Sequence, residues 1–152
     1  MRFLIKDDNY AEVVVVVPIV SRIIDTTENS SDKTYTVPDG ELWRLLHVYV
    51  TLVTTAKVGN RQVVVEGKNS AGLVLGRISA GAVQAASSTK YYNYMQGTYR
   101  ETAFINNDIQ VPIPVDVYLS EGASLHVYDS AAIDAAADDM TVSYSVQIYK
   151  GC

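Results

Sequence analysis

The chain has 152 residues, of which 48% are apolar and 19% charged, and its formal net charge at pH 7 is −5. This apolar fraction is that of a globular protein, so the composition excludes a disordered chain, and the length suits one domain with a sizeable core. The acidic balance and the lack of a basic stripe exclude a protein that wraps nucleic acid.

The N-terminal segment combines a polar stretch with a short apolar run. Asp7 and Asp8 interrupt the chain before any long apolar run, so we expect no secretory signal peptide and synthesis in a cytoplasm. We predict an arm over residues 1–12 and one domain over residues 13–152. Residues 13–17 are β-branched throughout and too few to cross a bilayer, which predicts no membrane partner. This run is either a central strand or an arm strand that completes a neighbour's sheet.

The rest of the chain alternates apolar and polar residues with a period of two, which is typical of strands with one buried face. Turn signals such as Pro38-Asp39-Gly40 and Gly59-Asn60 separate these segments. Residues 79–90 are small and weakly patterned, so they predict a loop or a loosely paired edge. Strands are expected at residues 19–26, 34–37, 42–55, 61–66, 73–78, 90–95, 111–120, 123–128 and 139–148.

No segment has a convincing helical pattern. Residues 131–139 are rich in alanine, which favours helix, but they are few and lie between strands, so we expect a turn with at most a 3₁₀ segment. The pattern therefore predicts an all-β fold. It is a single antiparallel β-sandwich, jelly-roll-like, with eight to nine strands and an extended N-terminal arm.

Histidine and cysteine, which often serve as catalytic residues or metal ligands, are few in this sequence and lie far apart. His47 and His126 lie in predicted strands without a second ligand or an orienting carboxylate nearby in sequence, which favours structural roles. Cys152 has no partner for an internal disulfide, and a terminal residue is poorly placed for catalysis. No catalytic residue and no cofactor are predicted.

An acidic group near the C-terminus is the strongest candidate for a cation site, because calcium takes several oxygen ligands from a loop. Its spacing does not match an EF-hand, so no metal is predicted. The alternative interpretation is a soluble loop in which one carboxylate accepts hydrogen bonds from backbone amides. The group consists of Asp129, Asp134, Asp138 and Asp139.

Tyrosines cluster between residues 91 and 99. Adjacent Tyr91 and Tyr92 face opposite ways in a strand, so at least one of them leaves the core. Tyrosines anchor protein interfaces and also pack inside sheets, and both interpretations stay open here. The interface candidates are Val13, Val15, Val17, Trp43, Tyr91, Tyr92, Tyr94 and Tyr99.

Several segments, in order, resemble structural β-sandwich proteins of tailed bacteriophages. Residues 34–46 (TYTVPDGELWRLL) run from a Val-Pro-Asp-Gly turn into a long strand, and residues 58–65 (VGNRQVVV) form a hairpin typical of such proteins. Residues 125–129 (LHVYD) and 136–140 (AADDM) then precede an alternating strand. These proteins are implied to be jelly-roll-like sandwiches.

The resemblance implies a non-enzymatic capsid decoration (cement) protein. It implies binding to the major capsid protein on the outer surface of the virion, self-association with a trimer favoured, and production in the host cytoplasm. One alternative is a tail or receptor-binding sandwich in which Trp43 and exposed tyrosines stack on host carbohydrate. A small hydrolase using Asp138 and Asp139 is a more remote alternative.

Overall fold

The computed structural model describes residues 2–6, 12–27 and 30–151, and for residues 2–6 and 12–16 the backbone path alone. The described residues form twelve strands and no helix. The strands are β1 (Arg2–Lys6), β2 (Glu12–Val16), β3 (Ile19–Asp25), β4 (Asp32–Thr36), β5 (Glu41–Val53), β6 (Val63–Lys68), β7 (Val74–Ser79), β8 (Thr89–Met95), β9 (Asp108–Pro112), β10 (Tyr118–Leu119), β11 (Ser124–Asp129) and β12 (Asp139–Lys150).

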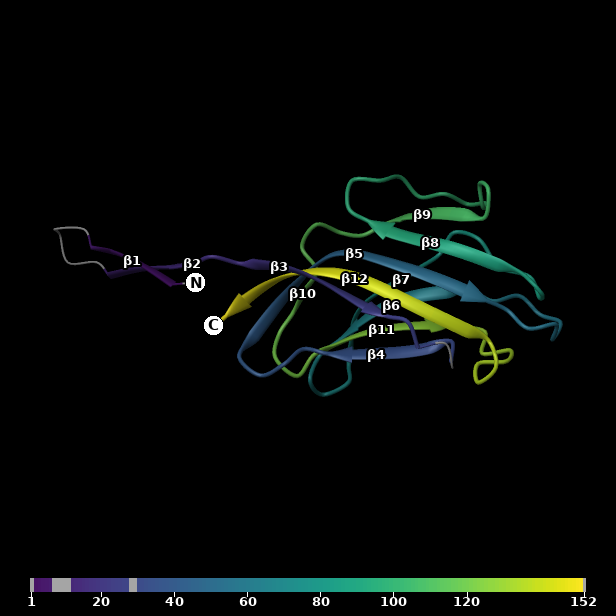
Figure 1. The fold of residues 1–152 in the computed structure, drawn as a ribbon, viewed down its shortest axis with the longest axis horizontal. Coiled ribbons are helices and arrows are strands. Elements are labelled where there is room, and N and C mark those ends of the chain that lie inside the picture. Colours follow the sequence, from purple (N-terminus) through teal and green to yellow (C-terminus); the bar gives the residue numbers. More distant parts are fainter. Residues whose placement is uncertain (1, 7–11, 28–29, 152) are drawn as a thin grey trace.

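Ten of these strands form two sheets that face each other (Figure 1). The six-stranded sheet has the order β3-β12-β5-β8-β9, with β10 also paired to β5, and the four-stranded sheet has the order β4-β11-β6-β7. The pairs β3–β12, β4–β11, β5–β8 and β6–β7 are nested in chain order, as if one long hairpin had been rolled into a sandwich. This is a jelly roll, which confirms the predicted all-β sandwich.

The core lies between the two sheets. It follows the predicted alternation in β12, whereas in β5 an irregularity at Leu46 changes which face is buried. Within β5, Val48, Val50 and Leu52 are fully buried, while the residues between them lie on the outer face. In β12 the same alternation buries Met140 and Val142. The other strands contribute to the same cluster, which includes Trp43, Tyr92, Tyr94, Ile109, Val111, Leu119, Val63, Val65, Leu125, Val127, Tyr144 and Val146.

The predicted strand over residues 111–120 is wrong in its extent. It is divided into β9, which ends at Pro112, and the two-residue β10, with a non-strand segment between them. Pro112 and Pro114 lack the backbone N–H that a continuing ladder requires, so the chain leaves the sheet there. β9 pairs parallel with β8, which makes the sandwich not purely antiparallel. The expected turn over residues 131–139 is confirmed, with no helix in it.

The N-terminal strands stand apart from the sandwich. β2 pairs antiparallel with β1 in a sheet of two strands, so the interpretation of residues 13–17 as a central strand is wrong. Figure 1 shows this β1–β2 ribbon continuing away from the start of β3. Residues 1 and 7–11 of the predicted arm, and Cys152, lie outside the described residues, and the arm boundary at residue 12 stays a prediction. In the described part of the chain no helix is long and apolar enough to cross a membrane.

Candidate interaction surfaces

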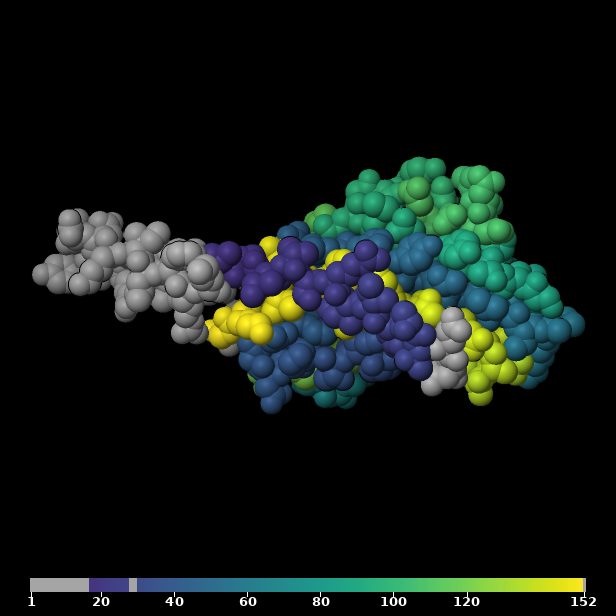
Figure 2. All heavy atoms as spheres, in the orientation of Figure 1, coloured from purple at the N-terminus to yellow at the C-terminus, as the bar shows by residue number. Residues whose placement is uncertain are grey.

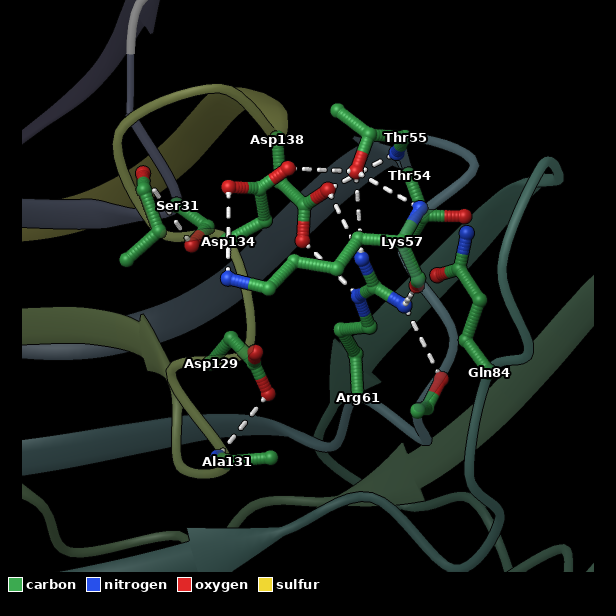
Figure 3. Close-up of polar contacts among 12 residues, drawn as sticks. Ser31, Thr54, Thr55, Lys57, Arg61, Gln84, Asp129, Ala131, Asp134 and Asp138 are labelled. Carbon is green, nitrogen blue, oxygen red and sulfur yellow. Dashed lines mark hydrogen bonds and ion pairs between the residues drawn. The ribbon is translucent and has the colours of Figure 1, made fainter.

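A buried ion pair closes the end of the sandwich where β5 ends and β12 begins (Figure 3). Arg61 and Asp138 are both 0% exposed, and the guanidinium Nε donates to Asp138 Oδ2 at 2.8 Å. Arg61 also donates to the carbonyl oxygens of Lys57 at 2.7 Å and Gly59 at 2.9 Å. Asp138 Oδ1 accepts from the backbone N–H of Thr55 at 2.8 Å. The pair therefore ties the β5–β6 loop to the β11–β12 loop.

The charges of this pair stabilise each other. Burial acts to raise the pKa of Asp138, but the hydrogen bonds from Arg61 and Thr55 outweigh it and hold that pKa below its ordinary value. The hydrogen bond to Asp138 raises the pKa of Arg61. Asp138 is thus an ionised structural partner of Arg61, which leaves it no free oxygen for acid–base work on a substrate.

The neighbouring aspartates also accept hydrogen bonds from loop residues. Asp134 Oδ2 accepts from the Thr55 hydroxyl at 2.7 Å. Asp129 Oδ1 accepts from the backbone N–H groups of Gln62 and Ala131, at 2.8 and 3.1 Å. The interpretation of Asp138 as an acceptor of backbone amides is confirmed, and Asp139 begins β12. Within residues 2–6, 12–27 and 30–151 no three His, Cys, Asp or Glu side chains are grouped as metal ligands would be.

The two histidines lie on the outer faces of opposite sheets. His47 Nε2 lies 2.6 Å from Asn93 Oδ1. His126 Nε2 lies 2.7 Å from Asp32 Oδ1, and its ring stacks on Tyr128 with 4.3 Å between the ring centroids. The fold thus supplies His126 with a carboxylate that the sequence did not reveal. Its Nδ1 lies 3.1 Å from the ammonium of Lys68 and 3.7 Å from Glu66 Oε1, so His126 belongs to a network of charged side chains.

The tyrosine cluster divides between core and surface. Tyr92 and Tyr94 are buried, and the Tyr94 hydroxyl donates to the carbonyl of Val63 at 2.8 Å. Burial raises the pKa of Tyr94 well above its ordinary value. Tyr91 faces outward and stacks on Tyr49 with 6.4 Å between the ring centroids, while Tyr99 is 67% exposed.

Three of the interface candidates are therefore wrong. Trp43, Tyr92 and Tyr94 lie inside the sandwich. Alternation in β8 buries Tyr92 and Tyr94 together. Trp43 faces the core because β5 has an extra residue, Leu46, opposite Ser145 and Val146, and this irregularity exchanges the two faces of the strand. The Trp43 indole N–H donates to Glu41 at 2.7 Å, which satisfies it within the chain. Tyr91, Tyr99 and Val17 remain accessible to different degrees.

The outer face of the six-stranded sheet has a central row of uncharged residues, beside which Arg22 donates to the Ser143 hydroxyl at 3.2 Å. Its central row crosses four strands in register: Ile24 of β3, Ser143 of β12, Tyr49 of β5 and Asn93 of β8. In Figure 2, β3 (purple), β12 (yellow) and β5 (blue) lie side by side across the viewed face. Ile24 is 60% exposed, so this face presents apolar as well as uncharged polar groups. That composition is typical of a protein interface.

A groove of about 350 Å³ opens at one edge of the sandwich, between β7 and residues 114–119. Core residues of both sheets line it: Leu45 and Leu119 from the six-stranded sheet, and Val65 and Leu125 from the four-stranded sheet. The half-exposed Leu75 also lines it. The remaining lining is Gly67, Gly76, Arg77, Ile78, Pro114, Asp116, Val117 and Tyr118. Sequence reasoning missed this groove, since its walls come from five separate segments: β5, β6, β7, residues 114–119 and β11.

Comparison with known proteins gives distant matches. No family model and no curated protein matches the chain. Among solved structures it is similar to a chain of turnip yellow mosaic virus, at 10% identity and a TM-score of 0.36, over 100% of this chain and 90% of that one. It is also similar to a chain in a structure of infectious bursal disease virus, Gx strain, at 11% identity and a TM-score of 0.34, over 96% of this chain and 44% of that one. Likeness at this level carries no argument, so the fold assignment rests on the strand pairing.

Proposed function

We propose that this chain is a non-enzymatic structural protein of a virus particle. More narrowly, we propose a decoration protein that binds the major capsid protein on the outer surface of the head and strengthens the shell against internal pressure. The observation that carries this proposal is the uncharged, partly apolar central row on the outer face of the six-stranded sheet, set on a jelly roll. Jelly rolls are recurrent in viral capsids, although the fold alone does not decide the function.

The rigidity of the sandwich fits a mechanical role. The nested strand pairs place contacts between the first and last strands of the domain, so that β3 is hydrogen-bonded to β12 over seven residue pairs. The buried pair of Arg61 and Asp138 fixes the loops at one end. A rigid sandwich of this kind transmits load between the partners it contacts, because neither its sheets nor these loops need to rearrange.

The charge of the chain favours a place outside the shell. With a net charge of −5, the protein is repelled by packaged nucleic acid rather than attracted to it. We therefore propose that it is made in the host cytoplasm and added to the outer surface of the particle. A homotrimer is the favoured assembly, as the sequence resemblance implies.

The alternative is a tail or receptor-binding sandwich that recognises host carbohydrate, since jelly rolls are also found among lectins. The exposed rings of Tyr99 and Tyr118 could stack on sugars. The burial of Trp43 removes the largest aromatic ring from any such platform. A glycan array on which the wild-type chain binds a defined sugar, and Y99A or Y118A does not, would favour this alternative.

The test of the decoration role is binding to shells assembled from the major capsid protein of the same virus. We expect the purified chain to sediment with the shells at a fixed ratio, and electron microscopy to place it on their outer surface. Ile24→Asp introduces a charge at the centre of the outer face and should weaken binding by about tenfold or more. Val58→Asp is the control, because Val58 is 90% exposed in a loop. A chain that stays in the supernatant, or I24D that binds as the wild type does, would contradict the proposal.

A further inference from the structure

We propose that the groove beside β7 receives the β1–β2 ribbon of a second copy of this chain. This inference rests on the proposed function, because it names the contact that would hold the oligomer together. It is carried by three features of the described residues: an unprotected strand edge, a gap between the sheets, and a ribbon that leaves the sandwich at the same end.

The first feature is the edge formed by β7. This strand pairs with β6 on one side and ends the four-stranded sheet on the other. Leu73, Val74 and Leu75 are three consecutive apolar residues at its start, and they are 66%, 50% and 59% exposed. Natural proteins normally protect such edges with charges, prolines or a covering segment. The charge within β7, Arg77, lies beyond this apolar start and is paired with Glu66. The apolar start of β7 is therefore a place where another strand can add to the sheet.

The second feature is the gap that the groove makes between the sheets. The groove reaches Leu119 and Leu125, which are buried core residues on opposite sheets. Along this edge, an inserted apolar side chain would therefore contact both layers of the core at once. A flat edge-to-edge pairing of two β7 strands would leave this gap unfilled, so the groove favours an inserted segment.

The third feature is the β1–β2 ribbon. Its two strands pair with each other and, among the described residues, with no third strand. The sequence of β2 is Glu-Val-Val-Val-Val and that of β1 is Arg-Phe-Leu-Ile-Lys, so most of the residues of the ribbon are apolar. An isolated two-stranded sheet is marginally stable in water at best. The ribbon therefore needs an apolar partner that the rest of its own chain, as described, does not provide.

The ribbon and the groove lie at the same end of the molecule. Ile19, the first residue of β3, is in register with Ile148 of β12, and Ile148 with Trp43 of β5. Trp43 is in turn in register with Leu119, which lines the groove. The base of the ribbon is thus three strand spacings from the groove, or about 15 Å. A ribbon that points away from its own body can then reach the groove of a neighbour placed around a rotation axis, and such head-to-tail contacts close into a ring.

The charges allow this docking. Lys6 and Glu12 are cross-strand partners at one end of the ribbon. The groove is lined by one residue of each sign, Arg77 and Asp116. Arg77 is already paired with Glu66 at 2.6 Å, so we place Lys6 of the docked ribbon beside Asp116 and the apolar residues of the ribbon in the groove.

The closing experiment is cysteine cross-linking in the full chain with Cys152→Ser as background. One variant carries Val14→Cys in β2 and another carries Leu75→Cys in β7, and the two are mixed under mild oxidation. We expect cross-linked dimers that contain one chain of each variant. Homodimers of the L75C variant alone would mean that β7 edges pair directly, which would overturn the proposal. A variant with both cysteines that cross-links only within one chain would also overturn it, since the ribbon would then occupy its own groove.

Analytical ultracentrifugation gives a second measurement. We expect the wild type and Val58→Asp to be oligomeric, and Leu75→Asp to self-associate more weakly by about tenfold or more. Because Leu75 is 59% exposed, the variant should retain the circular dichroism spectrum of the wild type. A monomeric wild type, or an L75D chain that associates normally, would contradict the inference. Failure to bind capsid shells with self-association intact would instead count against the proposed function alone.

Discussion

The two ends of β5 differ in whether the side chains around them find partners within the chain. Where β5 ends at Val53, the loops meet around Arg61 and Asp138, and both charges are buried and paired. Where β5 begins, Trp43 lies next to Leu119 and the groove that separates the two sheets. The first end is closed by its own side chains, and the second leaves apolar core residues facing a gap.

This difference teaches which part of the molecule holds the fold together and which part is available for binding. A buried ion pair is held by partners from the same chain, so it fixes loop geometry but presents nothing to a partner. An apolar gap beside an unprotected strand edge costs free energy in the isolated chain, and that cost is recovered when another segment fills it. Together with the proposed docking of a ribbon, this places the stabilising ion pair and the proposed assembly site at opposite ends of one strand.

The largest effect is expected from Asp138→Ala at the closed end. Removal of this carboxylate leaves the fully buried Arg61 without its ionic partner, which should lower the free energy of unfolding by about 3–5 kcal/mol. Urea denaturation followed by circular dichroism measures the change. Asp139→Ala removes the adjacent carboxylate and should change the unfolding free energy by no more than about 0.5 kcal/mol. Equal effects of the two variants would mean that the closed end does not depend on the ion pair.

A pair of glycine substitutions compares the packing of the two ends. A Cβ at Gly81 would overlap the backbone carbonyl oxygen of Glu101, so Gly81→Ala should cost about 1–3 kcal/mol of unfolding free energy. Gly76 lines the groove, and a Cβ there would meet nothing within 4 Å. Gly76→Ala should therefore be neutral or raise stability by up to about 1 kcal/mol, since glycine is unfavourable inside a strand. Thermal unfolding of both variants tests this, and a destabilised G76A would show that the groove end is packed as tightly as the other.

The smallest effect on stability is expected from removal of residues 1–16, the whole ribbon. The sandwich begins at β3, so the unfolding free energy of the shortened chain should stay within about 0.5 kcal/mol of the wild type when both are dilute and monomeric. Its self-association, measured at higher concentration, should be lost. A large fall in the melting temperature of the dilute chain would mean that the ribbon belongs to the core of the domain.

The sequence determined the fold class, because alternation of apolar and polar residues is a local property of a strand with one buried face. The alternation placed the core residues of β12 and of β5 from Val48 onward correctly, but it could not foresee the irregularity at Leu46 that buries Trp43 and Leu45. The adjacency of Tyr91 and Tyr92 required one ring to leave the core. It did not decide which ring, since that depends on how β8 is oriented against β5. Pro112 and Pro114 could have signalled the end of β9, had their missing N–H groups been weighed against the alternation.

The tertiary structure alone decided the features that join segments far apart in the sequence. Arg61 and Asp138 are 77 positions apart, and no local pattern marks them as partners. The pairing of β2 with β1 and the walls of the groove likewise depend on which strands become neighbours in the two sheets. Local patterning fixes which face of a strand is buried, whereas strand order and register are fixed by long-range contacts, and it is these contacts that create the ion pair and leave the edge of β7 open.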